Sequence, residues 1–263
     1  MTEETSSPQS STFTTLPWDG GRRVSLFDAH LERLEEHAGR LGLAWPSGSE
    51  ESVKSAVLEA MREALESPPE KPDKLTIGFL TVRLNGVEEF TAEARWVKEY
   101  PNPLTATAVA APRWGEGVTG TKHADWKPYS EAAKLAAERG CDIALLVDGD
   151  VVVDCCRATP LLLDDDGTAW YPDPALGSIE SVTLRCARTH LEAIGIPLSS
   201  GRLTKTLFSR ARSFVAVGTG VGAIRIASLD GQPIGDDSSL FPTRCAEAVE
   251  KAFSESWLQI PEE

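Results

Sequence analysis

Apolar residues recur at helical spacing in two segments near the start of the chain. The first segment predicts a helix over residues 26–41, because its apolar positions fall on one face three to four residues apart. These positions are Phe27, Leu31, Leu34, Ala38 and Leu41. Ser25 followed by Asp28 is a capping-box pattern, and Gly42 stands where a glycine often ends a helix. A second apolar face predicts a helix over residues 51–65.

Strand patterns surround these helices. A short apolar segment over residues 13–18 precedes a turn at Asp19-Gly20-Gly21. Residues 75–84 are typical of a strand, and the pair Asn85-Gly86 is a strong hairpin signal. We therefore expect residues 87–97 to return as the partner strand of a hairpin.

The second half of the chain alternates short apolar runs with turn residues. Hairpins are expected over residues 143–155 and 160–171, where Asp and Gly separate two apolar runs. Further strands are expected over 106–111, 214–217 and 224–229, and helices over 129–139, from about 179 to 194, over 204–210 and over 244–257. Because hairpins and helices mix in both halves, the pattern favours an α+β fold over a doubly wound parallel sheet.

The domain organisation follows from a proline-rich segment. Residues 100–104 contain Pro101 and Pro103 and are typical of a linker, so we place a boundary near residue 101. This predicts a smaller N-terminal domain over residues 1–101 and a larger C-terminal domain over residues 102–263. The first ten residues are polar and are expected to form a disordered tail.

Composition narrows the range of partners. Asp plus Glu total 40 and Lys plus Arg total 26, which gives a formal charge of −14. An acidic surface repels a phosphate backbone, so we expect no nucleic-acid partner. The five cysteines and four histidines show no metal-ligand spacing, so no metal site is predicted. No secretory signal pattern or membrane-length apolar run occurs, and we expect a cytoplasmic protein with reduced thiols.

Two common catalytic patterns are not supported. The sequence has no Gly-x-Ser-x-Gly turn of the kind that positions a hydrolase serine. Gly218-x-Gly220-x-Gly222 lacks the full dinucleotide fingerprint, and a strand rather than a helix is expected after it.

Four separated segments carry a stronger signal. Lys122-His-Ala-Asp-Trp precedes an alanine-rich helix, and the strand pair after that helix ends at Asp154, 32 residues later (154 − 122). Upstream, the helix over 26–41 contains His30-Leu-Glu-Arg33-Leu. Downstream, Arg157-Ala158-Thr159 follows the strand pair, and the strand from Phe214 leads into Gly218-Thr219-Gly220.

This order of segments resembles the class IV aminotransferase family, which has the fold type IV of pyridoxal phosphate (PLP) enzymes. The resemblance covers about residues 13–235. It implies that Lys122 is the catalytic lysine that bonds to PLP and that Asp154 lies beside the ring nitrogen. It assigns the cofactor phosphate to Arg33, Ile179, Gly218, Thr219 and Gly220. It also implies a barrel-like C-terminal sheet and a homodimer that acts on amino acids and 2-oxo acids.

The chemistry of these residue types suits the implied roles. A lysine bonds to an aldehyde only as a neutral amine, and burial favours that form. A carboxylate beside the ring nitrogen keeps the nitrogen protonated, so that the ring can accept electrons. A phosphate binds guanidinium, hydroxyl and backbone N–H groups. His123, Trp126 and Tyr129 can line the same pocket, but packing in the core explains them equally well.

Three departures from the family pattern leave alternatives open. Asp154 stands where the family usually has Glu, and Glu180 replaces a hydroxyl near the expected phosphate site. The family also usually has a strand and a glycine-rich turn before the segment that resembles residues 13–16. We expect an aminotransferase. The alternatives are a lyase resembling aminodeoxychorismate lyase, favoured by Arg157-Ala158-Thr159, and a family homologue without catalysis.

Overall fold

The computed structural model describes residues 7–66, 75–86 and 88–261. The chain divides into two compact units, each described separately below. The first unit comprises Met1–Glu99, Gly115–Trp126 and Phe253–Glu263, and the second comprises Tyr100–Trp114 and Lys127–Ala252. Most of the expected disordered tail lies outside the described residues, but Pro8–Ser10 forms a turn of 3-10 helix.

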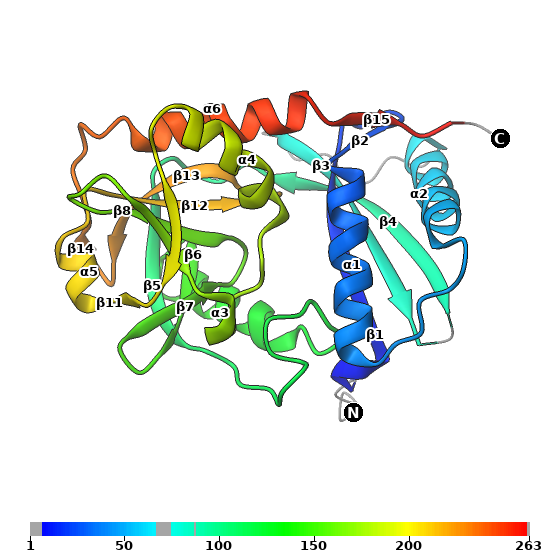
Figure 1. Cartoon of the computed structure of the whole chain (residues 1–263), viewed down its shortest axis with the longest axis horizontal. Coiled ribbons are helices and arrows are strands. Elements are labelled where there is room, and N and C mark those ends of the chain that lie inside the picture. The colour runs from blue at the N-terminus through cyan, green and yellow to red at the C-terminus, as the bar shows by residue number, and fades with distance from the viewer. Residues whose placement is uncertain (1–6, 67–74, 87, 262–263) are drawn as a thin grey trace. The chain divides into compact units, whose positions relative to one another are not determined.

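The first unit is built on an antiparallel sheet of five strands in the order β15-β2-β1-β3-β4 (Figure 1). The strands are β1 (Ser11–Trp18), β2 (Arg23–Ser25), β3 (Leu75–Asn85), β4 (Glu89–Lys98) and β15 (Trp257–Gln259). The predicted hairpin is confirmed, because Asn85 pairs with Glu89 across the turn. Residue 87, where the second strand was expected to begin, lies outside the described residues.

Two helices pack on this sheet, α1 (Phe27–Leu41) on β1 and α2 (Ser49–Glu66) on β3 and β4. Gly42 ends α1 as predicted, with φ 72° and its N–H directed to the carbonyls of Ala38 and Gly39. The expected cap at the start of α1 is wrong. Leu26 occupies the cap position without a side-chain bond, and Ser25 Oγ instead donates to the carbonyl of Phe253 at 3.0 Å.

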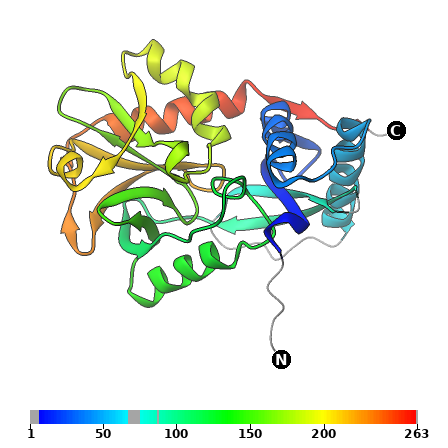
Figure 2. The same cartoon turned by 60° about the horizontal axis from the view of Figure 1, so that its bottom comes forward.

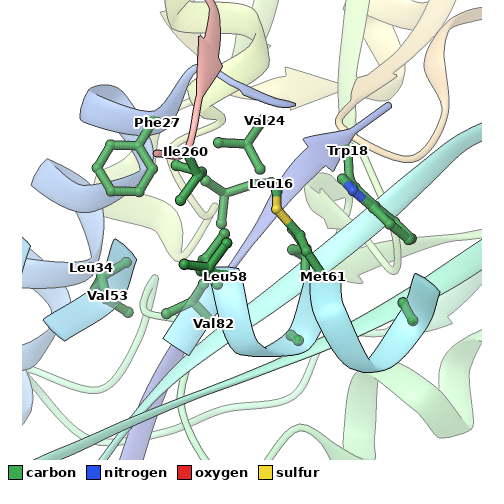
Figure 3. Close-up of a cluster of buried hydrophobic side chains, with 14 residues drawn as sticks. Leu16, Trp18, Val24, Phe27, Leu34, Val53, Leu58, Met61, Val82 and Ile260 are labelled. Carbon is green, nitrogen blue, oxygen red and sulfur yellow. The ribbon is translucent and has the colours of Figure 1, made fainter. Parts of the chain in front are cut away.

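The core of the first unit lies between the sheet and the two helices (Figure 3). It contains Leu16, Trp18, Val24, Phe27, Leu34, Val53, Met61, Val82 and Ile260, among others. Trp18 stacks on Trp96 with ring centroids 5.1 Å apart. A Cβ atom at Gly78 would lie 2.8 Å from the ring of Trp18 and 3.0 Å from that of Trp96, so only glycine leaves room for this stack.

The second unit contains a mixed sheet with strand order β10-β9-β8-β12-β13-β5-β6-β7-β11, and β14 pairs with β13. The strands are β5 (Leu104–Ala110), β6 (Ile143–Asp148), β7 (Val151–Cys155), β8 (Thr159–Leu163), β9 (Ala169–Pro172), β10 (Leu198–Gly201), β11 (Leu203–Thr204), β12 (Ser213–Gly218), β13 (Gly222–Leu229) and β14 (Gln232–Pro233). The sheet curls back on itself, because β11 at one end contacts β9 near the other (Figure 1, Figure 2). The expected barrel-like sheet and α+β class are therefore confirmed.

The helices of the second half are α3 (Lys127–Glu138), α4 (Val182–Ala193), α5 (Lys205–Ser209) and α6 (Phe241–Ser254), with a 3-10 turn over Pro174–Leu176. Several boundaries differ from the prediction, and the largest shifts are at the start of α4 and at both ends of the last helix, which begins at Phe241 rather than at residue 244. The start of α4 lies at Val182 rather than near residue 179, because Ser181 caps it by accepting the N–H of Leu184. The last helix ends at Ser254, and Trp257 belongs to β15. Within the described residues, no helix combines the length and apolar character needed to cross a membrane.

Candidate active site

Lys122 lies in the first unit, on the segment Gly115–Trp126 that contains no regular helix or strand. Both backbone polar groups of Lys122 are bonded. Its N–H donates to Nδ1 of His37 at 3.1 Å, and its carbonyl accepts the Thr12 hydroxyl at 2.7 Å and the Phe13 N–H at 3.2 Å. Residues of α1 and β1 therefore hold the lysine backbone from two sides.

Two aromatic rings flank the Lys122 side chain. Its Nζ atom lies 5.0 Å from the ring centroid of Phe13 and 5.0 Å from that of Trp126. The two rings meet edge to face with centroids 5.0 Å apart. This arrangement limits the directions in which the half-buried amine can point.

The segment before Lys122 is anchored to α1. Arg40 donates to the carbonyl of Thr119, and the Thr121 hydroxyl closes a local turn by donating to Val118 at 2.6 Å. Gly117 has φ 84°, and a Cβ atom there would lie 3.1 Å from the Arg40 carbonyl oxygen. Glycine is thus required both by the backbone conformation and by the close approach of α1.

His30 and Arg33, taken together in the sequence pattern, converge on one hydroxyl. Nδ1 of His30 lies 2.8 Å from Thr14 Oγ1, and Nη2 of Arg33 donates to the same oxygen at 2.7 Å. Arg33 is only 6% exposed, so its charge is largely withdrawn from water. A buried guanidinium is stabilised by acceptors and anions, which is consistent with a phosphate site.

The buried histidines near Lys122 stay neutral. Burial, together with the charges of Arg33 and Arg40, lowers the pKa of His37 from 6.5 to about 2. Burial also lowers the pKa of His123, against the opposing effect of Asp125. These rings therefore act as neutral hydrogen-bonding and packing groups.

Asp154 lies at the end of β7 in the second unit and is only 3% exposed. Its Oδ1 accepts the N–H of Cys155 at 2.8 Å. Its Oδ2 accepts the Tyr129 hydroxyl at 3.0 Å and the N–H of Ile179 at 3.3 Å. Three donors directed at one carboxyl group favour its ionised form.

Tyr129 orients Asp154 from α3. Its ring stacks on Trp114, with centroids 6.0 Å apart and an interplanar angle of 9°. Burial and then the Asp154 carboxylate raise the pKa of Tyr129 well above its usual range. The hydroxyl therefore remains a donor to Asp154.

The Gly218-Thr219-Gly220 turn joins β12 to β13 and is closed by the Val221 N–H, which donates to the Gly218 carbonyl at 3.2 Å. The Thr219 hydroxyl lies 3.2 Å from that of Thr183, which projects from the first turn of α4. A Cβ atom at Gly218 would lie 3.3 Å from Ala158 Cα and from the Arg157 carbonyl oxygen. The turn and the start of α4 thus place two hydroxyl groups together.

Comparison with known protein families shows to which family the chain belongs. The sequence profile described as amino-transferase class IV matches residues 11–229. The chain belongs to the class IV aminotransferase family. This match covers most of the chain, including Arg33, Lys122, Asp154 and Thr219.

Solved structures agree on the fold. A hypothetical aminotransferase from Mycobacterium tuberculosis in its PLP-bound form aligns with a TM-score of 0.76 and 20% identity, over 94% of this chain and 90% of that one. The same protein has a form with α-ketoglutarate and PMP bound. The Escherichia coli branched-chain amino acid aminotransferase aligns with a TM-score of 0.78 and 14% identity, over 96% and 91% of the two chains.

A solved structure with a different described activity is also similar to this chain. A structure described as a candidate 4-amino-4-deoxychorismate lyase has 25% identity and a TM-score of 0.68, with 93% of this chain and 90% of that chain covered. A search of curated proteins finds no match. The expected family, fold class and enzyme class are confirmed by these comparisons.

The structure adds contacts that the sequence did not indicate. Thr12 and His37 bind the Lys122 backbone, and Thr14 binds His30 and Arg33. A usable sequence signal is the presence of hydroxyl residues among the apolar residues of β1 and of histidines on the buried face of α1, where an unpaired polar group is costly. Thr183 is likewise a buried polar residue of a helix first turn.

The assignment of Ile179 to the phosphate stays a prediction. Because α4 begins at Val182, Ile179 lies before the helix, and its N–H donates to Asp154. Phosphate binding by this N–H would require that bond to be released. Glu180, whose charge was expected to oppose a phosphate, is exposed to solvent.

Proposed function

We propose that this class IV aminotransferase uses PLP, bonded through Lys122, to move an amino group from an amino acid to a 2-oxo acid. The observation that carries the proposal is that both backbone polar groups of Lys122 are hydrogen-bonded. His37 accepts its N–H, and Thr12 and Phe13 donate to its carbonyl, while the residue itself is only half-buried.

The residues that the family resemblance assigns to the cofactor have the chemistry that the parts of PLP require. The aldehyde matches the Lys122 amine, and the protonated ring nitrogen matches the ionised Asp154 carboxylate. The phosphate matches the Arg33 guanidinium in the first unit and the Thr219 hydroxyl in the turn after β12. Asp154 is one methylene shorter than the family's Glu, and three donors hold its carboxylate near the end of β7.

When bound, PLP supplies an electron-accepting ring that stabilises the negative charge left at the substrate α-carbon. Once the substrate amine has displaced it from the cofactor, Lys122 Nζ would take the proton from that carbon and pass it to the cofactor. Phe13 and Trp126 orient the amine for this transfer. Asp154 keeps its negative charge because Tyr129, Cys155 and Ile179 donate to it.

The second candidate is a lyase resembling aminodeoxychorismate lyase, which forms 4-aminobenzoate and pyruvate. The run Arg157-Ala158-Thr159 and the 25% identity to a candidate lyase favour it. Arg157 and Ala158 also pack against Gly218, next to the proposed phosphate turn. A homologue without catalysis is the third reading, supported by Glu180 and opposed by the support built around Lys122.

We further propose a cytoplasmic homodimer. The cytoplasm suits a chain with five cysteines, of which Cys155, Cys156 and Cys245 are buried thiols. The dimer is expected from the family, in which both subunits contribute residues near the substrate. Light scattering of the purified protein should give twice the 28.4 kDa chain mass.

The test is a substrate screen with PLP present. Each amino acid is paired with α-ketoglutarate, and the new 2-oxo acid and glutamate are measured by mass spectrometry. In a parallel reaction, aminodeoxychorismate is supplied and pyruvate is measured. Products that need both an amino acid and α-ketoglutarate support the aminotransferase, pyruvate from aminodeoxychorismate alone supports the lyase, and no product from either supports the homologue without catalysis.

A further inference from the structure

His37 lies on α1, 85 residues before Lys122, yet its ring binds the Lys122 backbone. The Nδ1 atom accepts the N–H at 3.1 Å, and His37 is only 1% exposed. A buried N–H group that loses its acceptor bears the full cost of desolvation. The histidine ring therefore satisfies a backbone group at the proposed catalytic lysine.

The hydrogen bond defines the state of this ring. Because Nδ1 accepts a hydrogen bond from the Lys122 N–H, Nδ1 itself carries no proton. The neutral imidazole therefore carries its proton on Nε2. Burial is the largest cause that lowers the pKa of His37 to about 2. The charged and titratable groups that act in the same direction are Arg33, Arg40, Lys122 and His123. The acceptor is thus present at every pH at which most enzymes work.

The carbonyl of Lys122 is held from the opposite direction by β1, through Thr12 and Phe13. With both adjacent peptide groups bonded, the direction of the Lys122 Cα–Cβ bond is defined. The position of Nζ then depends only on side-chain rotations, which Phe13 and Trp126 restrict. An error of about an ångström at a reacting group can cost about a hundredfold in rate, so this support has consequences for chemistry.

We propose that His37 is a positioning residue, which holds the backbone of Lys122 as a hydrogen-bond acceptor so that the amine meets the cofactor aldehyde. The inference rests on the proposed role of Lys122. His37 itself acts through the lysine and takes no part in proton transfer. The His37 side chain is buried, and its Nδ1 atom contacts the Lys122 backbone rather than the Lys122 amine.

Two substitutions distinguish the contribution of the hydrogen-bond acceptor of His37 from that of the volume of its ring. His37→Leu fills a similar volume without an acceptor. His37→Asn can place an amide oxygen near the position of Nδ1, and it has no titratable group. Met61→Ala is the matched control, because Met61 is fully buried in the core on α2 and its loss destabilises the same unit.

The first readout uses cofactor-free protein. Hydrogen–deuterium exchange at the Lys122 amide is compared with exchange of the β1 amides in the same sample. His37→Leu should raise the relative rate at Lys122 about tenfold, which is the typical effect of losing one buried hydrogen bond. His37→Asn should stay within a few-fold of the original protein, and Met61→Ala should leave the ratio unchanged.

The second readout uses PLP. His37→Leu should slow covalent attachment to Lys122, trapped with borohydride, and should lower kcat about tenfold with little change in KM. His37→Asn should restore most of both rates and keep the original pH profile. A shifted acid limb in His37→Asn would show that the ring titrates during turnover, and would overturn the role of a neutral acceptor.

The exchange experiment judges the contact even if PLP binds elsewhere. Equal protection of Lys122 in the original protein and in His37→Leu, or no protection in the original protein, overturns the proposal. If His37→Leu fails to fold, the hydrogen–deuterium exchange rates of the Lys122 amide in the original protein and in His37→Asn test the contact instead. If Lys122 is protected by His37 but no variant attaches PLP there, the proposed function fails while the structural contact stands.

Discussion

The two units support their candidate residues in different ways. In the first unit, Lys122 lies on a segment without regular structure, and its backbone is held by side chains 85 and 110 residues earlier in the chain. In the second unit, Asp154 ends a strand of the curled sheet, and its two partners outside β7 both lie 25 residues away. Lys122 thus depends on partners far away in the sequence, whereas Asp154 depends on its own strand neighbour Cys155 and on two partners at a shorter separation.

This difference predicts which substitutions should affect catalysis alone and which should also lower the stability of the fold. The Lys122 amine contacts two aromatic rings, whereas the backbone of Lys122 forms the bonds to α1 and β1, so loss of the amine should affect chemistry with little effect on folding. The Asp154 carboxylate binds two backbone N–H groups and a tyrosine, so its loss should affect both. The predictions below test that contrast, starting from the largest effect.

Lys122→Ala should lower turnover by roughly 10²–10⁴-fold, because the amine that moves the proton is lost. The melting temperature should change little, since the backbone bonds remain. Initial-rate kinetics and thermal unfolding measure the two effects. Lys127→Ala is the matched control, an exposed lysine that starts α3, and it should retain activity. A fully active Lys122→Ala would contradict the account.

Asp154→Asn should impair both chemistry and folding. We expect turnover to fall by about 10²-fold, and unfolding free energy to fall by roughly 1–3 kcal/mol, because buried donors lose a charged acceptor. Urea unfolding and initial rates report the two quantities. Asp150→Asn, in the exposed turn of the same hairpin, should change neither. A variant as stable as the original protein would show that the carboxylate does not support the sheet.

Arg33→Gln and Thr219→Val test the proposed assignment of each of these residues to the cofactor phosphate. Loss of charge-assisted bonds should weaken PLP binding by about tenfold to a hundredfold for Arg33→Gln, and by a few-fold for Thr219→Val. Binding of pyridoxal, which lacks the phosphate, should change little in either variant. Fluorescence titration with both compounds measures the difference, with Arg62→Gln on the exposed face of α2 as control. Equal losses for PLP and pyridoxal would sink the phosphate assignment.

His37 should contribute a smaller, pH-dependent effect on stability. The folded protein resists protonation of His37, whose pKa falls from 6.5 to about 2, whereas the unfolded chain takes up that proton below its ordinary pKa. Stability should therefore fall as pH decreases below about 6.5, by about 1 kcal/mol per pH unit. Urea unfolding at pH 6 and pH 5 measures this slope. In His37→Asn the slope should be shallower by that amount, and an unchanged slope would refute the assignment.

Much of the fold and part of the candidate site could be predicted from the sequence. The hairpin at Asn85 and the end of α1 at Gly42 follow from local turn chemistry, which needs no distant partner. The start of α1 could not be predicted in the same way, because Ser25 bonds to Phe253 from the far end of the chain. The predicted end of α6 was wrong for a similar reason, because Trp257 pairs with Ser25 in the sheet.

The same distinction applies to the candidate site. Asp154 and Gly218 end strands whose apolar patterns are visible in the sequence. The partners of Lys122 are a threonine and a histidine far earlier in the chain, and no local pattern links them to the lysine. Residue spacing therefore indicated which lysine to consider, but only the folded chain shows how that lysine is held.

The most direct test of the central claim is to find which lysine bonds to PLP. The protein is mixed with PLP, its visible absorbance is recorded, and the covalent bond is fixed with borohydride before peptide mass spectrometry. The account predicts a yellow absorbance band and a pyridoxyl group on Lys122, with neither in Lys122→Ala. A pyridoxyl group on another lysine, or no adduct at saturating PLP, would contradict it.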